Sequence, residues 1–175
     1  IVRSLSTDTR QLRPGEWFLA LRGENFDGHD FLDLALAKGA AGLIFDRRLA
    51  RREELGRAPA ALAVDDTLWA YGAIAQAWRR RLDPQVACIV GSGGKTTTKE
   101  MAGRALQRLR PALVSERNLN NLIGAPQTLL HLERGHECVV MELGMNALGE
   151  LRRLTEIADP DVALLTNIGN AHIGM

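Results

Sequence analysis

The sequence predicts an α/β protein in which a small mixed α/β unit, residues 1–83, precedes part of a parallel-sheet unit, residues 84–175. Two observations support this fold class. Short apolar runs alternate with segments of helical spacing, and after Pro84 strands and helices follow one another in turn, which implies right-handed crossovers and a parallel sheet. A hydrophobic content of 46% is ample for packed cores. The boundary is placed at Asp83-Pro84, where a long helical pattern ends.

In the first unit, three short apolar runs bounded by glycine, proline or charged residues have the character of strands: residues 15–21, 40–45 and 59–64. Apolar residues recur with helical spacing at 31–38 and, more strongly, at 67–82. Asp65, Asp66 or Thr67 can cap the first turn of the longer helix, and arginines occupy its last turn.

In the second unit, the order of elements predicts a parallel sheet with crossover helices. The expected elements are a strand at 85–90, a helix at 96–109, a strand at 137–141, a helix near 149–158 and a strand at 162–166.

The charge balance does not favour nucleic acid or an anionic membrane as a partner, but it is compatible with a small anionic ligand. With 22 basic and 21 acidic residues the net charge is +1, so we expect neither nucleic acid nor an anionic membrane as a partner. Cys88 and Cys138 lie in apolar runs without metal-ligand spacing, which predicts reduced core residues. No run of about 18 uncharged apolar residues occurs, and the first residues lack a signal-peptide pattern. We therefore expect a soluble protein, cytoplasmic by default.

The segment VACIVGSGGKTTTKE, residues 86–100, runs from an apolar strand into a glycine-rich loop and then a helix. Amide groups of such a loop converge at the positive end of the helix dipole, where phosphate binds. Glycines permit close approach, Lys95 can reach the outer phosphates, and Thr96 can offer a hydroxyl to Mg²⁺. The standard phosphate-binding loop has four residues between its first glycine and the Gly-Lys pair. Here only two, Ser92 and Gly93, separate Gly91 from that pair. The alternative is a glycine-rich turn without a ligand.

This loop resembles the ATP-binding loop of the Mur ligases, whose usual form is close to T-G-x-x-G-K-T-T, with Val90 in place of the threonine. Further segments are similar to motifs of the same family: STDTRQLRPGEWFLALRGENFDGHDF, NLNNLIGAPQTLL, MELGMNALGEL and LLTNIGNAHIGM. The resemblance covers nearly the whole chain, and five motifs in order are more specific than any one of them.

The resemblance implies an ATP-dependent amide-bond ligase of peptidoglycan precursor synthesis, serving cell-wall formation and cell division. It is greatest to the member that joins D-alanyl-D-alanine to UDP-N-acetylmuramoyl-tripeptide through an acyl phosphate, with ATP and Mg²⁺. Residues 1–83 would bind the UDP part of the substrate, and residues 84–175 would be part of a P-loop ATP-binding domain. The implied ATP-binding residues are Gly91, Ser92, Gly93, Gly94, Lys95, Thr96 and Thr97.

An acidic residue follows the second strand of the parallel unit. Glu142 would reach the same sheet edge as the loop, where a hard cation fits. The resemblance implies that Thr96, Glu142 and His172 hold the metal and that Lys95, Asn121 and His172 are catalytic. The alternatives are a turn-capping glutamate at 142 and an exposed polar histidine at 172, since imidazole is an unusual Mg²⁺ ligand.

The asparagine-rich segment 118–126 matches no helix or strand pattern, which predicts a loop. Asparagine amides bind both carbonyl and phosphate oxygens, and the resemblance implies that Asn120 and Asn121 approach the substrate. A turn in which asparagine tolerates left-handed backbone is the alternative. Arg117 stands where the family often has glycine.

In the first unit the resemblance implies that a group of polar residues binds the substrate: Ser6, Asp8, Arg10, Asp27 and His29. Thr9 keeps a hydroxyl where the family usually has serine. Local turn chemistry is the alternative for residues 27–30.

Two other functions remain open at this point. One is another Mur ligase, which adds diaminopimelate or lysine; the asparagine-rich segment argues against it. The other is a non-catalytic nucleotide-binding module, against which Glu142 and His172 argue. The family continues beyond the third strand motif into a further domain, so we expect a fragment of a longer ligase, monomeric when full length.

Overall fold

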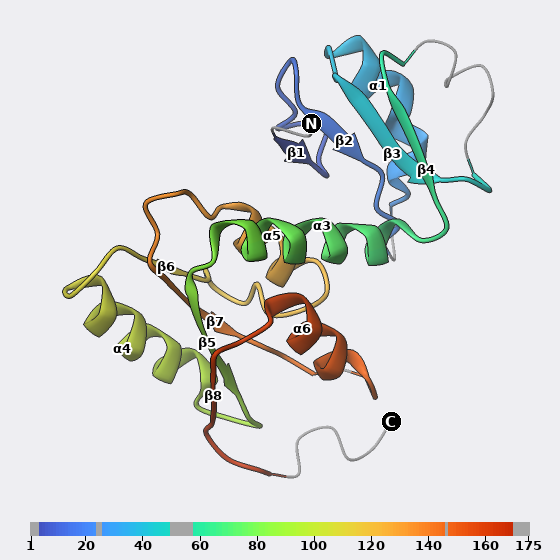
Figure 1. Ribbon diagram of the computed structural model, residues 1–175. Coiled ribbons are helices and arrows are strands. Elements are labelled where there is room, and N and C mark those ends of the chain that lie inside the picture. Colours follow the sequence, from blue (N-terminus) through green and yellow to red (C-terminus); the bar gives the residue numbers. More distant parts are fainter. Residues whose placement is uncertain (1–3, 24–25, 50–57, 146, 170–175) are drawn as a thin grey trace. The chain divides into compact units, whose positions relative to one another are not determined.

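Two parallel four-stranded sheets organise the described part of the chain (Figure 1). A computed structural model describes residues 4–23, 26–49, 58–145 and 147–169. The chain divides into two units, Ile1–Tyr71 and Gly72–Met175. The α/β class with parallel sheets is confirmed.

The division falls inside a helix, α3 (Thr67–Leu82), and not after it at Asp83-Pro84 as the sequence suggested. Ala75 is fully buried in the core of the second unit, and Trp78 and Leu82 pack against the same core. The second half of α3 therefore belongs to the second unit. Its first turn is capped by Asp66, whose Oδ1 accepts a 2.8 Å hydrogen bond from Trp69 N.

The first unit contains a sheet of order β1-β2-β3-β4 with every pair parallel. Its elements are β1 (Leu5–Ser6), β2 (Trp17–Leu19), the 3₁₀ turn η1 (Gly28–Phe31), α1 (Leu32–Ala37), β3 (Gly42–Asp46) and β4 (Ala61–Val64). The three predicted strands are confirmed as β2, β3 and β4, and the helix at 31–38 as α1. Two residues of β1 carry too little pattern to be predicted.

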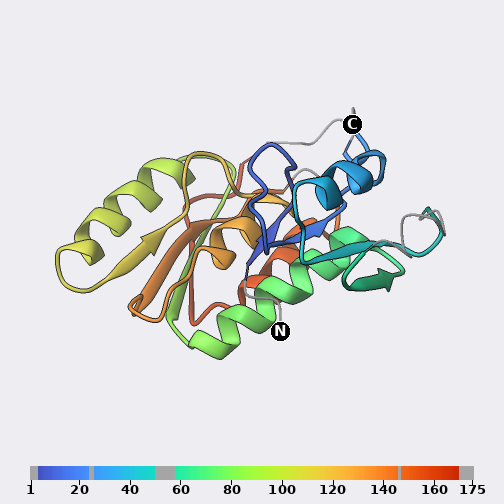
Figure 2. The ribbon, with the colours of Figure 1, turned by 90° about the horizontal axis from the view of Figure 1, so that it is seen from above.

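The second unit contains a parallel sheet of order β6-β7-β5-β8. Its elements after α3 are β5 (Gln85–Val90), α4 (Lys95–Gln107), β6 (Ala112–Val114), α5 (Gly124–Leu130), β7 (Cys138–Glu142), α6 (Glu150–Ala158) and β8 (Val162–Leu165). Helix α4 covers one face, while α5, α6 and the second half of α3 cover the other (Figures 1 and 2). Three predicted strands and two predicted helices are confirmed.

The loop predicted at residues 118–126 is partly wrong, because α5 begins at Gly124. Pro126 lies in the first turn of α5, where a helix needs no amide hydrogen from it. The strand β6 also escaped prediction, since it has only three residues.

The topology places the ends of β5 and β7 next to each other at one sheet edge. From β5 the chain goes to β6 on one side of the sheet, whereas from β7 it returns to β8 on the other side of β5. In open parallel sheets, ligands bind at such a switch point, outside the carboxyl ends of the strands.

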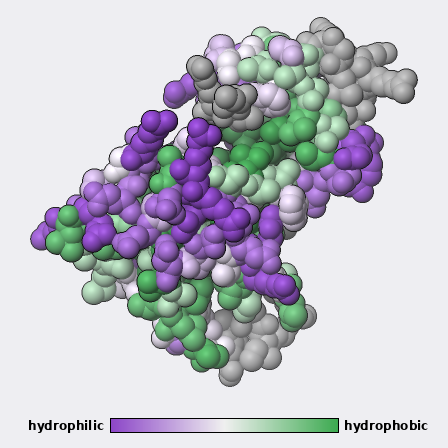
Figure 3. Space-filling view, viewed as in Figure 1, coloured by the Kyte–Doolittle hydropathy of each residue, from purple (hydrophilic) through white to green (hydrophobic). Residues whose placement is uncertain are grey.

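The strand β8 lies at the edge of this sheet and exposes its apolar side chains. Val162 is 62% exposed and Leu165 55% exposed. Hydrophobic surface gathers toward the lower end of the second unit in Figure 3, where Figure 1 draws β8. None of the helices in the described ranges has the length and apolarity to cross a bilayer.

Candidate active site

The loop of residues 91–94 joins the end of β5 to the first residue of α4. Gly91 has φ +137° and Gly94 has φ +77°, backbone conformations that other residues rarely adopt. A Cβ atom on Gly91 would also collide with the side chain of Thr166. Both positions therefore require glycine, and without side chains there a ligand can approach the backbone at close range.

Lys95 lies across this loop. Its Nζ atom donates a 2.7 Å hydrogen bond to Gly91 O, at the opposite end of the loop. The ammonium group is thereby held at the helix N-terminus, where the helix dipole is positive. Lysine, loop amides and dipole together form a cradle for a polyanion.

The segment that follows β8 holds the loop from the other side. Thr166 Oγ1 donates to Gly93 O at 2.7 Å, and Asn167 Oδ1 accepts a 2.9 Å hydrogen bond from Gly93 N. Ser92 Oγ accepts a 2.9 Å hydrogen bond from Gly169 N. Thr166 and Asn167 were not predicted as site residues, because only the parallel pairing of β8 with β5 brings them to the loop.

Glu142 is the last residue of β7 and is only 3% exposed. Thr96 Oγ1 donates to its Oε2 atom at 2.7 Å, and Asn120 Nδ2 donates to its Oε1 atom at 2.8 Å. Three segments far apart in the sequence, α4, the asparagine-rich loop and β7, thus meet at one carboxylate.

The donor set at Glu142 fits Mg²⁺ bound together with a phosphate. Mg²⁺ in phosphate-transfer sites keeps several waters and takes one or two carboxylates with substrate phosphates. Glu142 supplies a carboxylate and Thr96 a hydroxyl next to it. The described residues contain no group of three His, Cys, Asp or Glu side chains that would form an all-protein cage. His172, the other expected metal ligand, lies outside the described residues.

Asn120 and Asn121 have different surroundings. Asn120 contacts Glu142, whereas Asn121 Oδ1 accepts hydrogen bonds from Ile123 N at 3.1 Å and Gly124 N at 2.8 Å. Asn121 therefore shapes the start of α5, and its catalytic role remains a prediction. Arg117, at the entrance of this loop, has φ +44°, which explains why glycine would suit the position.

A hollow of about 280 Å³ lies at this edge of the sheet. It is lined by the loop residues Gly91, Ser92 and Lys95, by Asn120, and by residues that follow β7 and β8, among them Gly144 and Asn167. The hollow joins the phosphate cradle to the asparagine-rich loop.

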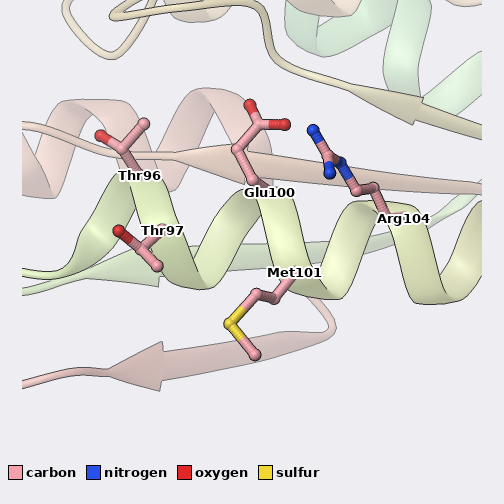
Figure 4. A pocket seen from close by; sticks show the side chains of 5 residues that line it. All are labelled: Thr96, Thr97, Glu100, Met101 and Arg104. Atoms are coloured by element: carbon pink, nitrogen blue, oxygen red, sulfur yellow. The ribbon is translucent and has the colours of Figure 1, made fainter.

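A second depression, of about 310 Å³, lies on α4 itself. Figure 4 shows Thr96, Glu100 and Arg104 projecting from one side of α4 and Thr97 and Met101 from another. Thr97 points away from the side on which Thr96 meets Glu142, so only Thr96 of this pair reaches the carboxylate.

The predicted substrate residues of the first unit form two local groups. Ser6 Oγ donates to Asp8 O at 3.0 Å, and the Asp8 carboxylate binds Arg10, with a shortest distance of 2.6 Å. The hydrogen-bonded Arg10 guanidinium lowers the pKa of Asp8 below its usual value.

The second group lies around η1. His29 is buried; its Nε2 atom accepts a 2.9 Å hydrogen bond from Asp46 N, and its Nδ1 atom lies 2.6 Å from Asp27 Oδ1. Both ring nitrogens of His29 are thus engaged within the protein, which supports a structural role for the ring.

Two family models match the chain, both from one family. The Mur ligase middle domain matches residues 89–175, and the model described as Mur ligase family, catalytic domain, matches residues 1–79. The chain belongs to the Mur ligase family. The resemblance to this family inferred from the five motifs is therefore confirmed.

Known Mur ligases resemble the chain along almost all of its length. Over 99% of its own length the chain is 43% identical to the UDP-N-acetylmuramoyl-tripeptide–D-alanyl-D-alanine ligase of Synechocystis. Over 97% of its own length it is 41% identical to the ligase of the same name from Escherichia coli. The MurF crystal structure from Acinetobacter baumannii superimposes with a TM-score of 0.89 at 40% identity over 99% of the chain.

The MurF structure from Thermotoga maritima, solved in complex with ADP, has a TM-score of 0.86 and 32% identity over 98% of the chain. The Mur ligase chain described here spans only part of these relatives: 38% of the Synechocystis ligase, 36% of the Escherichia coli ligase and 37% and 39% of the two MurF structures.

Proposed function

We propose that this chain is part of an ATP-dependent ligase that joins D-alanyl-D-alanine to UDP-N-acetylmuramoyl-tripeptide in peptidoglycan precursor synthesis. The observation that carries the proposal lies at one end of a parallel sheet: Lys95 and Asn120 line one hollow, and Asn120 and Thr96 both donate to the buried carboxylate of Glu142. Similarity to ligases of this name over nearly the whole chain supports the same function.

In the first step, a carboxylate oxygen of the tripeptide attacks the γ-phosphorus of ATP. The new O–P bond forms as the bond to the ADP oxygen breaks, which leaves an acyl phosphate. Both reactants are anionic, so the barrier falls when positive groups meet the developing charge. Lys95, which is held across the loop by Gly91 O, and the amides at the N-terminus of α4 would provide these groups, whereas the amide of Gly93 donates to Asn167.

Mg²⁺, when bound, would neutralise phosphate charge and orient the transferred group. Glu142 and Thr96 are the described residues that would hold it, and His172 is a further candidate. Asn120 keeps the Glu142 carboxylate in place through its 2.8 Å hydrogen bond.

In the second step, the amine of D-alanyl-D-alanine attacks the acyl carbon, phosphate leaves, and the amine loses a proton. The N-terminal unit would hold the UDP part of the substrate, with Ser6, Asp8, Arg10, Asp27 and His29 as the predicted residues. Because ATP and a nucleotide-linked substrate are consumed, we place the reaction in the cytoplasm. That the full-length ligase is a monomer is a separate part of the proposal.

The test uses a full-length ligase that contains this chain. It is incubated with ATP and Mg²⁺, with D-alanyl-D-alanine as the acceptor for UDP-N-acetylmuramoyl-tripeptide and with diaminopimelate or lysine as the acceptor for the UDP substrate that lacks the third residue. Phosphate release and the mass of the product are measured, with ATP omitted as the control. A pentapeptide product formed only with D-alanyl-D-alanine supports the proposal. Phosphate release without any amide product would instead favour a nucleotide-binding ATPase module, and use of diaminopimelate would favour another Mur ligase.

A further inference from the structure

A buried lysine lies one helical turn away from Thr96. Lys99 is 0% exposed, although most residues of its helix, α4, are at least partly exposed to solvent. Its Nζ atom donates to Ser115 O at 2.6 Å and to Arg117 O at 3.3 Å, and lies 3.0 Å from Glu100 Oε1. The ammonium group therefore has three oxygen partners and no solvent.

Two of these partners are main-chain carbonyls at the entrance of the asparagine-rich loop. Ser115 follows β6, and Arg117 adopts the left-handed backbone from which the loop departs. Three residues beyond Arg117 the chain reaches Asn120, whose side-chain amide contacts Glu142. Lys99 thus holds the base of the segment that carries Asn120.

A second connection runs from Ser115 to the carboxylate directly. Ser115 is 1% exposed, its main-chain N donates to Val140 O at 2.9 Å, and its Oγ atom accepts a 3.2 Å hydrogen bond from Glu142 N. Hydrogen bonds join Thr96 to Glu142, Glu142 to Ser115, and Ser115 to Lys99. Thr96 and Lys99 are neighbours three residues apart on α4, so these contacts form a closed ring. We name these four residues the Lys99 ring.

Stability alone does not require a lysine at this position. Burying an ammonium group costs desolvation free energy, and an apolar side chain of similar length would fill the space without that cost. A charge with fixed partners does specify geometry, because each partner must stay within hydrogen-bonding distance. The ring is therefore suited to fixing the position of Glu142 and Asn120 relative to the phosphate loop.

We propose that Lys99 is a positioning residue of the ligase site: it fixes the Asn120 loop and Glu142 relative to the first turn of α4. The proposal for Lys99 rests on the proposed function in one respect: the ligation reaction is the activity that the test measures. Lys99 does not touch the hollow, so it acts through Ser115, Arg117 and the residues that they place. Partners that orient metal ligands typically affect metal affinity or activity by about 10- to 100-fold.

The test compares Lys99→Met with a matched control in the full-length ligase. Gly103→Ala is the control, since a Cβ at this buried position of α4 would press on the side chain of Val114 without touching the ring. The measurements are turnover against Mg²⁺ concentration, KM for the UDP substrate, ADP affinity and hydrogen exchange of residues 115–121. Each variant is assayed at a temperature where it is folded.

Lys99→Met should lower kcat by about 10- to 100-fold, raise the Mg²⁺ concentration for half-maximal rate, and speed exchange of residues 115–121, with KM for the UDP substrate unchanged. Gly103→Ala should lose stability but keep the wild-type Mg²⁺ requirement and loop exchange. Combining Lys99→Met with Ser115→Ala should lower kcat by less than the product of the two single effects, because both act on one ring.

Equal behaviour of Lys99→Met and Gly103→Ala, or multiplicative effects of Lys99→Met and Ser115→Ala, would overturn the positioning role. If Lys99→Met does not fold, Lys99→Arg takes its place: it keeps the charge but moves the donors, so a wild-type Mg²⁺ requirement would count against the proposal. A wild-type enzyme without amide product refutes the proposed function instead, while loop exchange and ADP affinity still decide the role of Lys99.

Discussion

Thr96 Oγ1 donates a 2.7 Å hydrogen bond to Oε2 of Glu142, 46 residues further along the chain. The contact joins the first turn of α4 to the end of β7, the two places where a sheet of this topology presents its ligand-binding edge. It brings the hydroxyl of the phosphate loop and the buried carboxylate into one site, and the predictions below depend on that site.

Replacing Lys95 by alanine should abolish ligation in the full-length enzyme and leave binding of the UDP substrate intact. The ammonium group contacts Gly91 O and serves the phosphates, so its loss should lower kcat by about 100- to 1,000-fold or more. Arg104→Ala, which removes an exposed charge from the same helix, is the control and should retain activity. Steady-state kinetics and titration with the UDP substrate measure both effects. Near-normal turnover of Lys95→Ala would contradict the assignment of this loop as the site that binds the ATP phosphates.

Glu142→Gln keeps the shape of the side chain and removes its charge. Activity should fall and recover partly at higher Mg²⁺, because the weakened metal site is then filled by mass action. Glu137→Gln, an exposed site just before β7, is the matched control. If Glu142→Gln loses stability but is fully active at ordinary Mg²⁺, the carboxylate caps a turn and holds no metal.

Arg117→Gly should stabilise the second unit by about 1 kcal/mol or less. The position has φ +44°, which costs a non-glycine residue about 1–2 kcal/mol, and the greater freedom of glycine in the unfolded chain offsets part of the gain. Arg104→Gly, within α4, should instead destabilise by about 1 kcal/mol. Urea unfolding of the full-length protein measures both, and a loss of stability in Arg117→Gly would contradict the expectation.

Neither thiol should react in the folded protein. Burial raises the pKa of Cys88 to about 12 and also raises the pKa of Cys138. Since thiolate forms only as pH rises toward the pKa, about one Cys88 side chain in 10⁴ is ionised at pH 8. Iodoacetamide labelling at pH 8 should modify neither cysteine until the chain is unfolded in guanidinium chloride; rapid labelling of native Cys88 would argue against its buried placement.

The 175 residues by themselves should not ligate, because they span 36–39% of the ligases that they resemble. The edge strand β8 exposes Val162, Leu164 and Leu165, so the second unit alone should associate through this edge. Orienting two reactants can be worth roughly 7 to 11 kcal/mol, and the remaining part of a full-length ligase would contribute to that orientation. Mass spectrometry after incubation with ATP, Mg²⁺ and both substrates should detect no pentapeptide; turnover near that of a full-length ligase would disprove this.

The sequence by itself determined the class of the fold, the long helix α3, the strand and helix on either side of the phosphate loop, and the family. These features depend on residues that are close together in the sequence. Apolar periodicity specifies a strand or helix, and glycines followed by lysine and threonine are typical of a loop that binds phosphate. Glu142 could be placed at the correct sheet edge for the same reason, since it ends an apolar run.

Tertiary structure alone decided features that depend on contacts between distant segments. Gly124 starts a helix where a loop was expected, Asn120 and not Asn121 meets Glu142, and the unit boundary falls inside α3 because Trp78 packs in the second core. Lys99 looks like an ordinary helix surface residue in the sequence, yet it is buried against the carbonyls that follow β6. No local pattern records such partners, because a buried polar group is defined by the hydrogen bonds that folding brings to it.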